Sequence, residues 1–373
     1  MKKRRKAMII ILISIAGLTL SFLAGIIITR NFVYTPPFID AEGKILSGSI
    51  SEFRRVEIGG YSQAILIRGS SVENPVLLYL HAGPGMSEMG LFRNMHSELE
   101  DHYTVVHWDQ RGTGKSYSPF LDSETLTVDQ MVQDTHELTL YLKKVLGKEK
   151  IILMGHSWGT GLGVLTASKY PDDYLAYIGM AQVVNVEKSD KMSYLAAMEC
   201  ARSEGNDKAV NDLEQIDGFW SKRDKNYMSN MMKMKKWVFY YGGCLSGHKN
   251  LSMVMGNILS RECTIFDYPA LLLGSNFSLK TMAANISYFD AMKEIPVLNV
   301  PFFLLEGRQD KNSMSSLAEE YFNFVSAPQK ELFWFNNSAH WPNLEERDKF
   351  HSIMINQIGP MINYQGELLA SHK

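Results

Sequence analysis

Residues 154–160 read Met154-Gly155-His156-Ser157-Trp158-Gly159-Thr160 and give the clearest indication of the architecture of this chain. The apolar run 151–153 before it predicts a strand, and the small residues 161–168 after it predict a helix. The two glycines stand two places either side of Ser157, where they let strand and helix approach closely around a tight turn. The pattern predicts a serine exposed at a strand-to-helix turn, with the helix amino terminus behind it. The alternative is a chance pentapeptide in a glycine-rich loop.

The segments around this turn alternate between strand and helix patterns. We expect strands at 53–58 and 61–67 (a hairpin around Gly59-Gly60), 76–80, 103–108, 151–153, 174–180, 300–305 and 331–335, and helices at about 128–146, 161–168 and 346–364. This alternation predicts an α/β fold, in which a mostly parallel sheet carries helices on both faces.

The strand pattern stops between about residues 186 and 295. This stretch is helical in tendency and rich in methionine, lysine and aromatic residues, so we expect an inserted helical cap over the carboxyl edge of the sheet. Its methionines include Met228, Met231, Met232 and Met234. They could line an adaptable apolar cavity, contact a membrane surface, or simply pack between helices.

The first thirty residues resemble a membrane anchor rather than part of the fold. Residues 2–6 are all basic, and the uncharged run 8–29 that follows would reach roughly 33 Å as a helix, enough to span a bilayer. A cleaved signal peptide has a shorter apolar region and a small-residue cleavage site, and a buried core helix would not follow five basic residues. We therefore expect an uncleaved, single-pass anchor in the cell membrane, with a cytoplasmic amino terminus and an extracytoplasmic catalytic domain.

At 373 residues, the chain has room for one large domain with an insertion or for two domains. We divide it into a basic segment and anchor (1–30), a stalk (31–44), the first part of the core (45–185), the cap (186–295) and the second part of the core (296–373). We see no internal repeat.

The composition excludes some classes of partner. Lysine and arginine (38) balance aspartate and glutamate (40), so nothing indicates a nucleic-acid partner. Cys200, Cys244 and Cys263 form neither a disulfide framework nor a zinc motif, although one pair could bridge outside the cell. No His-Glu-x-x-His pattern occurs, and we expect no metal and no cofactor.

A serine nucleophile needs a base to take its proton and an acid to orient that base. Asp310 follows the strand predicted to end at residue 305, and His340 follows the strand predicted to end at residue 335. Both therefore lie in loops at the edge that holds Ser157, and we predict Ser157, Asp310 and His340 as a catalytic triad. Glu306 is the rival acid. The alternatives are a solvated loop histidine and a turn-forming aspartate.

An oxyanion formed during catalysis needs backbone N–H donors. One should be Trp158, the residue after the nucleophile, and the other should come from the loop after strand 76–80. Gly83 is our choice there and Ala82 the second option, since Pro84 has no N–H. We expect structural roles for His81 and His156.

Three stretches together resemble the proline iminopeptidase family of α/β-hydrolases. They are His81-Ala82-Gly83-Pro84-Gly85, Trp108-Asp109-Gln110-Arg111-Gly112-x-Gly114-x-Ser116 and Gly155-His156-Ser157-Trp158-Gly159. The resemblance covers about residues 50–185 and 296–360. It implies the same triad, a helical cap, and the release of an amino-terminal residue, often proline, from small peptides.

Two positions depart from the family pattern. Ala82 stands where the family has the second residue of His-Gly-Gly-Pro-Gly, which crowds the oxyanion loop slightly. The family holds the free amino group of its substrate with cap glutamates, and Glu199, Glu204 and Glu262 are the acidic candidates for substrate binding by location.

Three functions remain open from the sequence. The first is a membrane-anchored serine aminopeptidase that acts on small peptides through an acyl-enzyme. The second is a carboxylesterase or lipase with an apolar acyl pocket in the cap. The third is a non-catalytic binding domain built on the hydrolase fold. The oligomeric state is open as well.

Overall fold

The computed structural model describes residues 34–216, 226–246, 260–264 and 266–362, together with residues 8, 11, 14, 15 and 17–21 near the amino terminus. In this part of the chain no helix is both long enough and apolar enough to cross a bilayer. Most of the predicted anchor at 8–29 lies outside the described residues.

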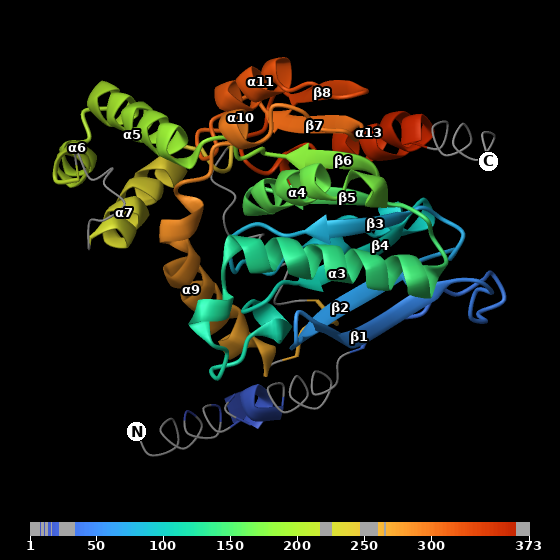
Figure 1. Cartoon of the computed structure of the whole chain (residues 1–373). Coiled ribbons are helices and arrows are strands. Elements are labelled where there is room, and N and C mark those ends of the chain that lie inside the picture. The colour runs from blue at the N-terminus through green and yellow to red at the C-terminus, as the bar shows by residue number, and fades with distance from the viewer. Residues whose placement is uncertain are drawn as a thin grey trace.

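The described residues form one eight-stranded sheet in the order β1-β2-β4-β3-β5-β6-β7-β8 (Figure 1). β2 runs antiparallel to β1 and to β4, and the other neighbours are parallel. The strands are β1 Ile50–Ile58, β2 Tyr61–Gly69, β3 Val76–Leu80, β4 Thr104–Asp109, β5 Ile151–His156, β6 Tyr174–Met180, β7 Phe302–Gly307 and β8 Lys330–Phe335. The carboxyl ends of β3 to β8 therefore meet at one edge of the sheet.

Alternate residues of the central strands enter two separate apolar clusters. On β3, Leu78 and Leu80 pack with α3, α4 and α11, whereas Leu77 and Tyr79 pack on the other face with α2 and α13. These helices are α2 Met89–Met95, α3 Val128–Leu146, α4 Trp158–Lys169, α11 Ser315–Phe324 and α13 Arg347–Ile353. Burial on both faces explains why β3 is a continuous apolar run rather than an alternating one.

The chain between β6 and β7 contributes helices beside the carboxyl edge of the sheet (Figure 1). They are α5 Val186–Ser203, α6 Asp207–Glu214, α7 Tyr227–Tyr240, α9 Asp267–Ile286 and the short α10 Ala291–Glu294. A third apolar cluster, which includes Met198, Leu213, Met234 and Trp237, packs α5, α6 and α7 together. Met234 is thus a packing residue, whereas other methionines of α7 face a cavity described below.

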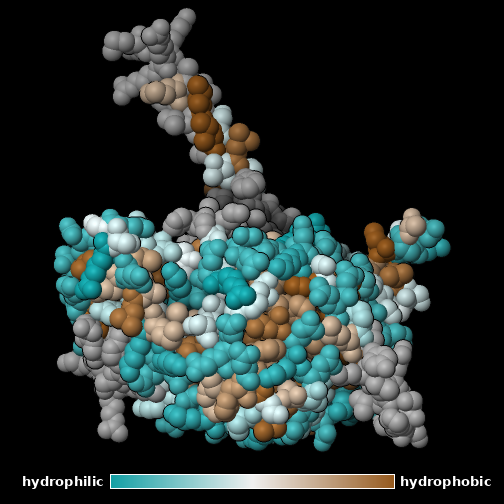
Figure 2. Space-filling model, turned by 90° about the horizontal axis from the view of Figure 1, so that it is seen from above, coloured by the Kyte–Doolittle hydropathy of each residue, from teal (hydrophilic) through white to brown (hydrophobic). Residues whose placement is uncertain are grey.

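The carboxyl-terminal part of the described chain is helical, as the sequence predicted for about residues 346–364. The predicted final helix begins as α13 and continues into a π-helical turn, Met354–Ile358. Cys200, Cys244 and Cys263 are free thiols. On the face seen in Figure 2, polar side chains prevail and apolar ones occur in small groups.

The turn between β5 and α4 leaves no space for a side chain at Gly155 or Gly159. A Cβ added at Gly159 would lie 2.1 Å from the carbonyl oxygen of Leu80, and one added at Gly155 would lie 2.2 Å from the carbonyl oxygen of Gly159. Ser157 between them has φ 52° and ψ −119°, a conformation that non-glycine residues rarely adopt. The two glycines are therefore required by close backbone approach, as the sequence pattern predicted.

This packing predicts opposite effects for two glycines of α4. Gly159→Ala should lower the free energy of unfolding by about 1–3 kcal/mol or more, because the methyl group would overlap backbone that cannot move away. Gly161→Ala should raise it by about 0.5–1 kcal/mol, because its methyl group would meet Phe289 at an ordinary 3.7 Å and alanine favours helix. Urea unfolding measures both, and equal stability of the two variants would contradict the packing argument.

Candidate active site

The strained turn presents Ser157 at the carboxyl edge of the sheet. Its backbone N–H donates to the carbonyl of Met180 at the end of β6, 3.0 Å away, which holds the turn against the neighbouring strand. α4 begins at the next residue, Trp158. The hydroxyl therefore lies above the sheet and next to the positive end of a helix.

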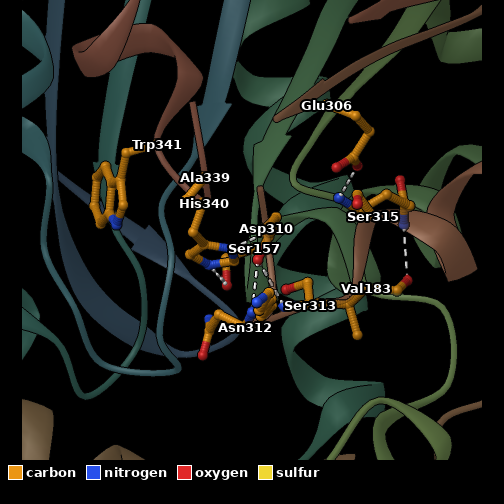
Figure 3. A network of polar contacts seen from close by, with 12 residues as sticks. Ser157, Val183, Glu306, Asp310, Asn312, Ser313, Ser315, Ala339, His340 and Trp341 are labelled. Atoms are coloured by element: carbon orange, nitrogen blue, oxygen red, sulfur yellow. Dashed lines mark hydrogen bonds and ion pairs between the residues drawn. The ribbon is translucent and has the colours of Figure 1, made fainter. Parts of the chain in front are cut away.

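A continuous chain of hydrogen bonds joins Ser157, His340 and Asp310 (Figure 3). His340 Nε2 lies 2.9 Å from Ser157 Oγ, and His340 Nδ1 lies 2.8 Å from Asp310 Oδ2. A carboxylate only accepts hydrogen bonds, so Nδ1 carries a proton and Nε2 offers a lone pair to the serine hydroxyl. This arrangement can remove the serine proton as the oxygen attacks an acyl carbon.

The acid is held by its own loop. Asp310 Oδ1 accepts the backbone N–H groups of Asn312 at 2.7 Å and Ser313 at 3.0 Å. Burial alone would raise the pKa of Asp310, but His340 and these hydrogen bonds hold the pKa of the carboxyl below its ordinary value. Burial lowers the pKa of His340, and Asp310 opposes that shift only in part. At neutral pH the pair is thus a carboxylate and a neutral imidazole.

Glu306, the rival acid, points elsewhere. It ends β7 and accepts the backbone N–H of Gln182 at 2.5 Å rather than contacting His340. Burial and the nearby Asp310 raise the pKa of Glu306 well above its ordinary value, and its Oε2 is buried with no hydrogen-bond partner in the described chain. A neutral carboxylic acid is the form that such a site tolerates.

The hydrogen bonds of the loop after β3 distinguish Gly83 from Ala82 as the candidate for the second oxyanion donor. The backbone N–H of Ala82 is committed to Glu88 Oε1 at 3.1 Å, which leaves Gly83 as the candidate beside Trp158. Gly83 has φ 136°, and a Cβ there would lie 2.4 Å from the nitrogen of Gly85. Ala82 does not have a positive φ, so its methyl group causes no backbone strain.

A cavity of about 1010 Å³ opens between the sheet edge and the cap. Ser157, Gly83, Trp158 and His340 lie in its wall on the sheet side. The opposite wall is mostly apolar and comes from α7 and α9, including Met231, Met232, Phe239, Leu271, Leu272 and Leu279. Met231 and Met232 are thus the cap methionines that line an apolar cavity.

The three cap glutamates chosen from the sequence do not line this cavity. Glu199 and Glu204 are exposed on the outer surface of the cap. Glu262 is fully buried and pairs with Arg93 of α2, whose Nε lies 3.2 Å from Glu262 Oε1. None of the three predicted substrate contacts is therefore supported by the geometry.

Among the described residues, the carboxylates in the cavity wall are instead those of Glu88 and Asp190. Asp190 belongs to α5 and is only 5% exposed, with Oδ1 3.2 Å from Lys235 Nζ of α7 and Oδ2 accepting from the Tyr227 hydroxyl at 3.5 Å. The sequence carried a signal for Asp190, because an acid on the apolar face of a helix must be paired when buried.

Within the described residues, no group of three or more His, Cys, Asp or Glu is arranged to hold a metal ion.

Known proteins share this architecture. Residues 75–231 match the family model of the alpha/beta hydrolase fold. "Probable aminopeptidase YbaC" of Bacillus subtilis (strain 168) is 32% identical over 308 residues, 81% of this chain and 94% of that protein. A proline iminopeptidase of Heyndrickxia coagulans is 23% identical over 337 residues, 89% of this chain and 99% of that protein. The crystal structure of proline iminopeptidase from Mycobacterium smegmatis has a TM-score of 0.59 at 17% identity and covers 86% of this chain and 100% of that one. The chain therefore belongs to the α/β-hydrolase family, in which the relatives described above are named as an aminopeptidase and as proline iminopeptidases.

Proposed function

We propose that this chain is a serine hydrolase with Ser157 as nucleophile. The observation that carries the proposal is the hydrogen-bond chain from Ser157 through His340 to Asp310 at the wall of the cavity. Ser157 Oγ attacks the acyl carbon while its proton moves to His340 Nε2. The backbone N–H groups of Gly83 and Trp158 stabilise the negative oxygen of the tetrahedral intermediate.

The remaining steps use the same groups. When the intermediate collapses, His340 gives its proton to the leaving nitrogen or oxygen, and an acyl-enzyme on Ser157 remains. His340 then takes a proton from water as the water oxygen attacks the acyl carbon, and it returns that proton to Ser157 Oγ when the bond from Oγ to the acyl carbon breaks and the acid leaves. Asp310 keeps the imidazole in the correct tautomer and stabilises its charged form throughout.

We further propose that the substrate is a small peptide with a free amino terminus. Asp190 supports this choice, because it brings a carboxylate of the cap into the wall of the cavity that also contains Ser157. Asp190 pairs with Lys235 and accepts from Tyr227, so a substrate ammonium group would share this carboxylate with them. Glu88 accepts from Tyr79 and Ala82 and contacts His156. A substrate ammonium group at Asp190 would form a charge-assisted hydrogen bond, worth about 1.5–3 kcal/mol. The names of the relatives point to the same activity.

The second candidate is a carboxylesterase or lipase. It is favoured by the apolar residues that α7 and α9 contribute to the cavity, which suit an acyl chain better than a peptide. A non-catalytic binding domain is the third, and a buried, complete triad would be superfluous in it.

We also propose that residues 8–29 anchor the enzyme in the cell membrane, with the catalytic domain outside. The described residues of this segment are helical and lie apart from the sheet (Figure 1). More than half of the surface of Met8, Ile11, Ile15, Leu18 and Leu20 is exposed. Apolar side chains exposed in this way, preceded by a basic cluster, support an anchor.

The substrate proposal predicts a charge-dependent preference for free amino termini. Asp190→Asn keeps the shape of the side chain but removes its charge, so it should raise KM for a prolyl or leucyl arylamide by roughly 10–100-fold. Hydrolysis of a short acyl ester should change little. Glu187→Gln, an exposed acid of the same helix, is the matched control and should leave both activities unchanged. Ser157→Ala provides the blank.

The outcomes separate the three candidates. The esterase is favoured if the enzyme hydrolyses the ester but not the arylamide, and if acetylation of the substrate amino group leaves its activity unchanged. Absence of Ser157 labelling by a fluorophosphonate in folded protein would favour a binding domain.

The pKa of His340 predicts the acid limb of the pH profile. His340 accepts the serine proton only when neutral, that is, above its pKa, and burial lowers this pKa below its ordinary 6.5. The rate of fluorophosphonate labelling at Ser157 should therefore fall toward acidic pH with its midpoint below 6.5. Asp310→Asn should lower the plateau of the labelling rate by orders of magnitude, ~10⁴ in serine proteases. It should also move the midpoint of the acid limb to still lower pH, because the carboxylate that raises the pKa of His340 is lost. A limb with its midpoint above 6.5 would contradict this description.

The anchor proposal predicts the behaviour of the full chain in a bacterial host. It should sediment with membranes, resist extraction by high salt and dissolve only in detergent. Ile15→Arg combined with Leu18→Arg should shift it to the soluble or secreted fraction, because each charge at the centre of a span costs about 2.5–3.5 kcal/mol. Full chain that stays soluble without detergent would refute the anchor.

A further inference from the structure

A buried carboxylate lies behind the loop that carries Gly83. Glu88 Oε1 accepts the backbone N–H of Ala82 at 3.1 Å and lies 3.1 Å from His156 Nδ1, and its Oε2 accepts the hydroxyl of Tyr79. Glu88 is 1% exposed and His156 is fully buried. Neither residue touches the Ser157 hydroxyl.

The second nitrogen of His156 reaches the loop of the base. His156 Nε2 lies 3.0 Å from the backbone carbonyl oxygen of His340. The backbone N–H of His340 donates to the carbonyl of Cys244, also 3.0 Å away. Both peptide groups of the base are thus held, one by His156 and one by the cap segment.

The partners of Glu88 and His156 show which of their atoms must donate and which must accept hydrogen bonds. A backbone carbonyl only accepts, so His156 Nε2 must carry a proton. Glu88 Oε1 already accepts from Ala82, and one more proton lies between Oε1 and His156 Nδ1. Burial alone would raise the pKa of Glu88, but His156 and the hydrogen bonds hold that pKa below its ordinary value. This shared proton makes the hydrogen bond between Glu88 Oε1 and His156 Nδ1, so that both ring nitrogens of His156 are engaged.

We infer that Glu88 and His156 are positioning residues that tie the oxyanion loop to the loop of the base. This inference rests on the proposed serine hydrolase. Glu88 fixes the Ala82 peptide and so aims the next N–H, that of Gly83, at the oxyanion. His156 fixes the carbonyl of His340 and so sets the imidazole of His340 over Ser157. One hydrogen-bonded pair thus sets the distance between the oxyanion donor and the base.

The energetics favour such a role over plain stabilisation. A buried pair of ionisable groups gains little or nothing in stability over apolar residues of the same size, because both groups lose their hydration. Misplacing a reacting group by about 1 Å, by contrast, can cost roughly 10²-fold in rate. The pair joins the loop after β3, the carboxyl end of β5 and the loop after β8, which are far apart in the chain.

Three substitutions break the pair at different points. Glu88→Gln cannot accept from Ala82 and also donate to His156 Nδ1 through the same atom. His156→Gln can keep a donor near the Nε2 position but loses the link to Glu88. His156→Asn can keep a donor near the Nδ1 position but loses the link to His340. We expect each to slow fluorophosphonate labelling of Ser157 by roughly 10–100-fold well below its melting temperature.

A second readout separates positioning from folding. A peptidyl trifluoromethyl ketone forms a tetrahedral adduct with Ser157, so its inhibition constant should rise by the factor by which labelling slows, while KM for substrate stays within about threefold. Asp134→Asn is the matched control. Asp134 is also a fully buried carboxylate in an ion pair, 2.7 Å from Arg111 Nε, but lies outside the site. It should lose stability and keep the wild-type labelling rate.

The inference is overturned if folded Glu88→Gln labels as fast as the wild type, or slows no more than Asp134→Asn. Should Glu88→Gln not fold, the two His156 variants decide by the same comparison. Wild-type protein that does not label at all would refute the proposed hydrolase instead, so the two failures are distinguishable.

Discussion

The close approach of the β5–α4 turn to the end of β3 is the constraint on which the site depends. The space beside Gly159 is filled by the carbonyl of Leu80, so α4 lies directly against the strand that leads into the Gly83 loop. A similar contact occurs further along the edge, where a Cβ at Gly307 would lie 1.9 Å from the carbonyl oxygen of Ala339, next to His340. Ser157, the Gly83 loop, Asp310 and His340 are thus brought to one edge with the help of backbone contacts that leave no room for a side chain.

Buried charge at this edge is costly, and the structure offsets the cost locally. Asp310 is stabilised by His340 and by two backbone N–H groups, and Glu88 by a backbone N–H, a hydroxyl and His156. Among the described residues, Glu306 has only the backbone N–H of Gln182 as a donor, and burial together with Asp310 raises its pKa well above the ordinary value. The environment therefore assigns different roles to carboxylates of nearly equal burial, as desolvation and hydrogen bonding oppose each other.

The elements of the core were predictable because their patterns are local. Strand β3 and helix α3 have the predicted bounds, since a continuous apolar run and an amphipathic period identify buried strand and helix directly. The cap was predictable as helical but not in its orientation. Glu199, Glu204 and Glu262 were chosen by location, whereas the acid that faces the cavity is Asp190, on the apolar side of α5. The role of His156 at the turn was expected to be structural, and its partners emerged only from the fold.

The amino-acid sequence was sufficient to predict the order of strands and helices, the glycine-flanked serine, and the positions of an acid and a histidine after two later strands. These follow from neighbouring residues, whose periodicity and turn chemistry act over a few positions. Three contacts required the folded chain: that His340 meets Asp310 and not Glu306, that Glu88 binds the N–H of Ala82, and that Asp190 reaches the cavity. Each of these contacts depends on where a side chain or an N–H points when segments many residues apart pack together, and no local pattern encodes that direction.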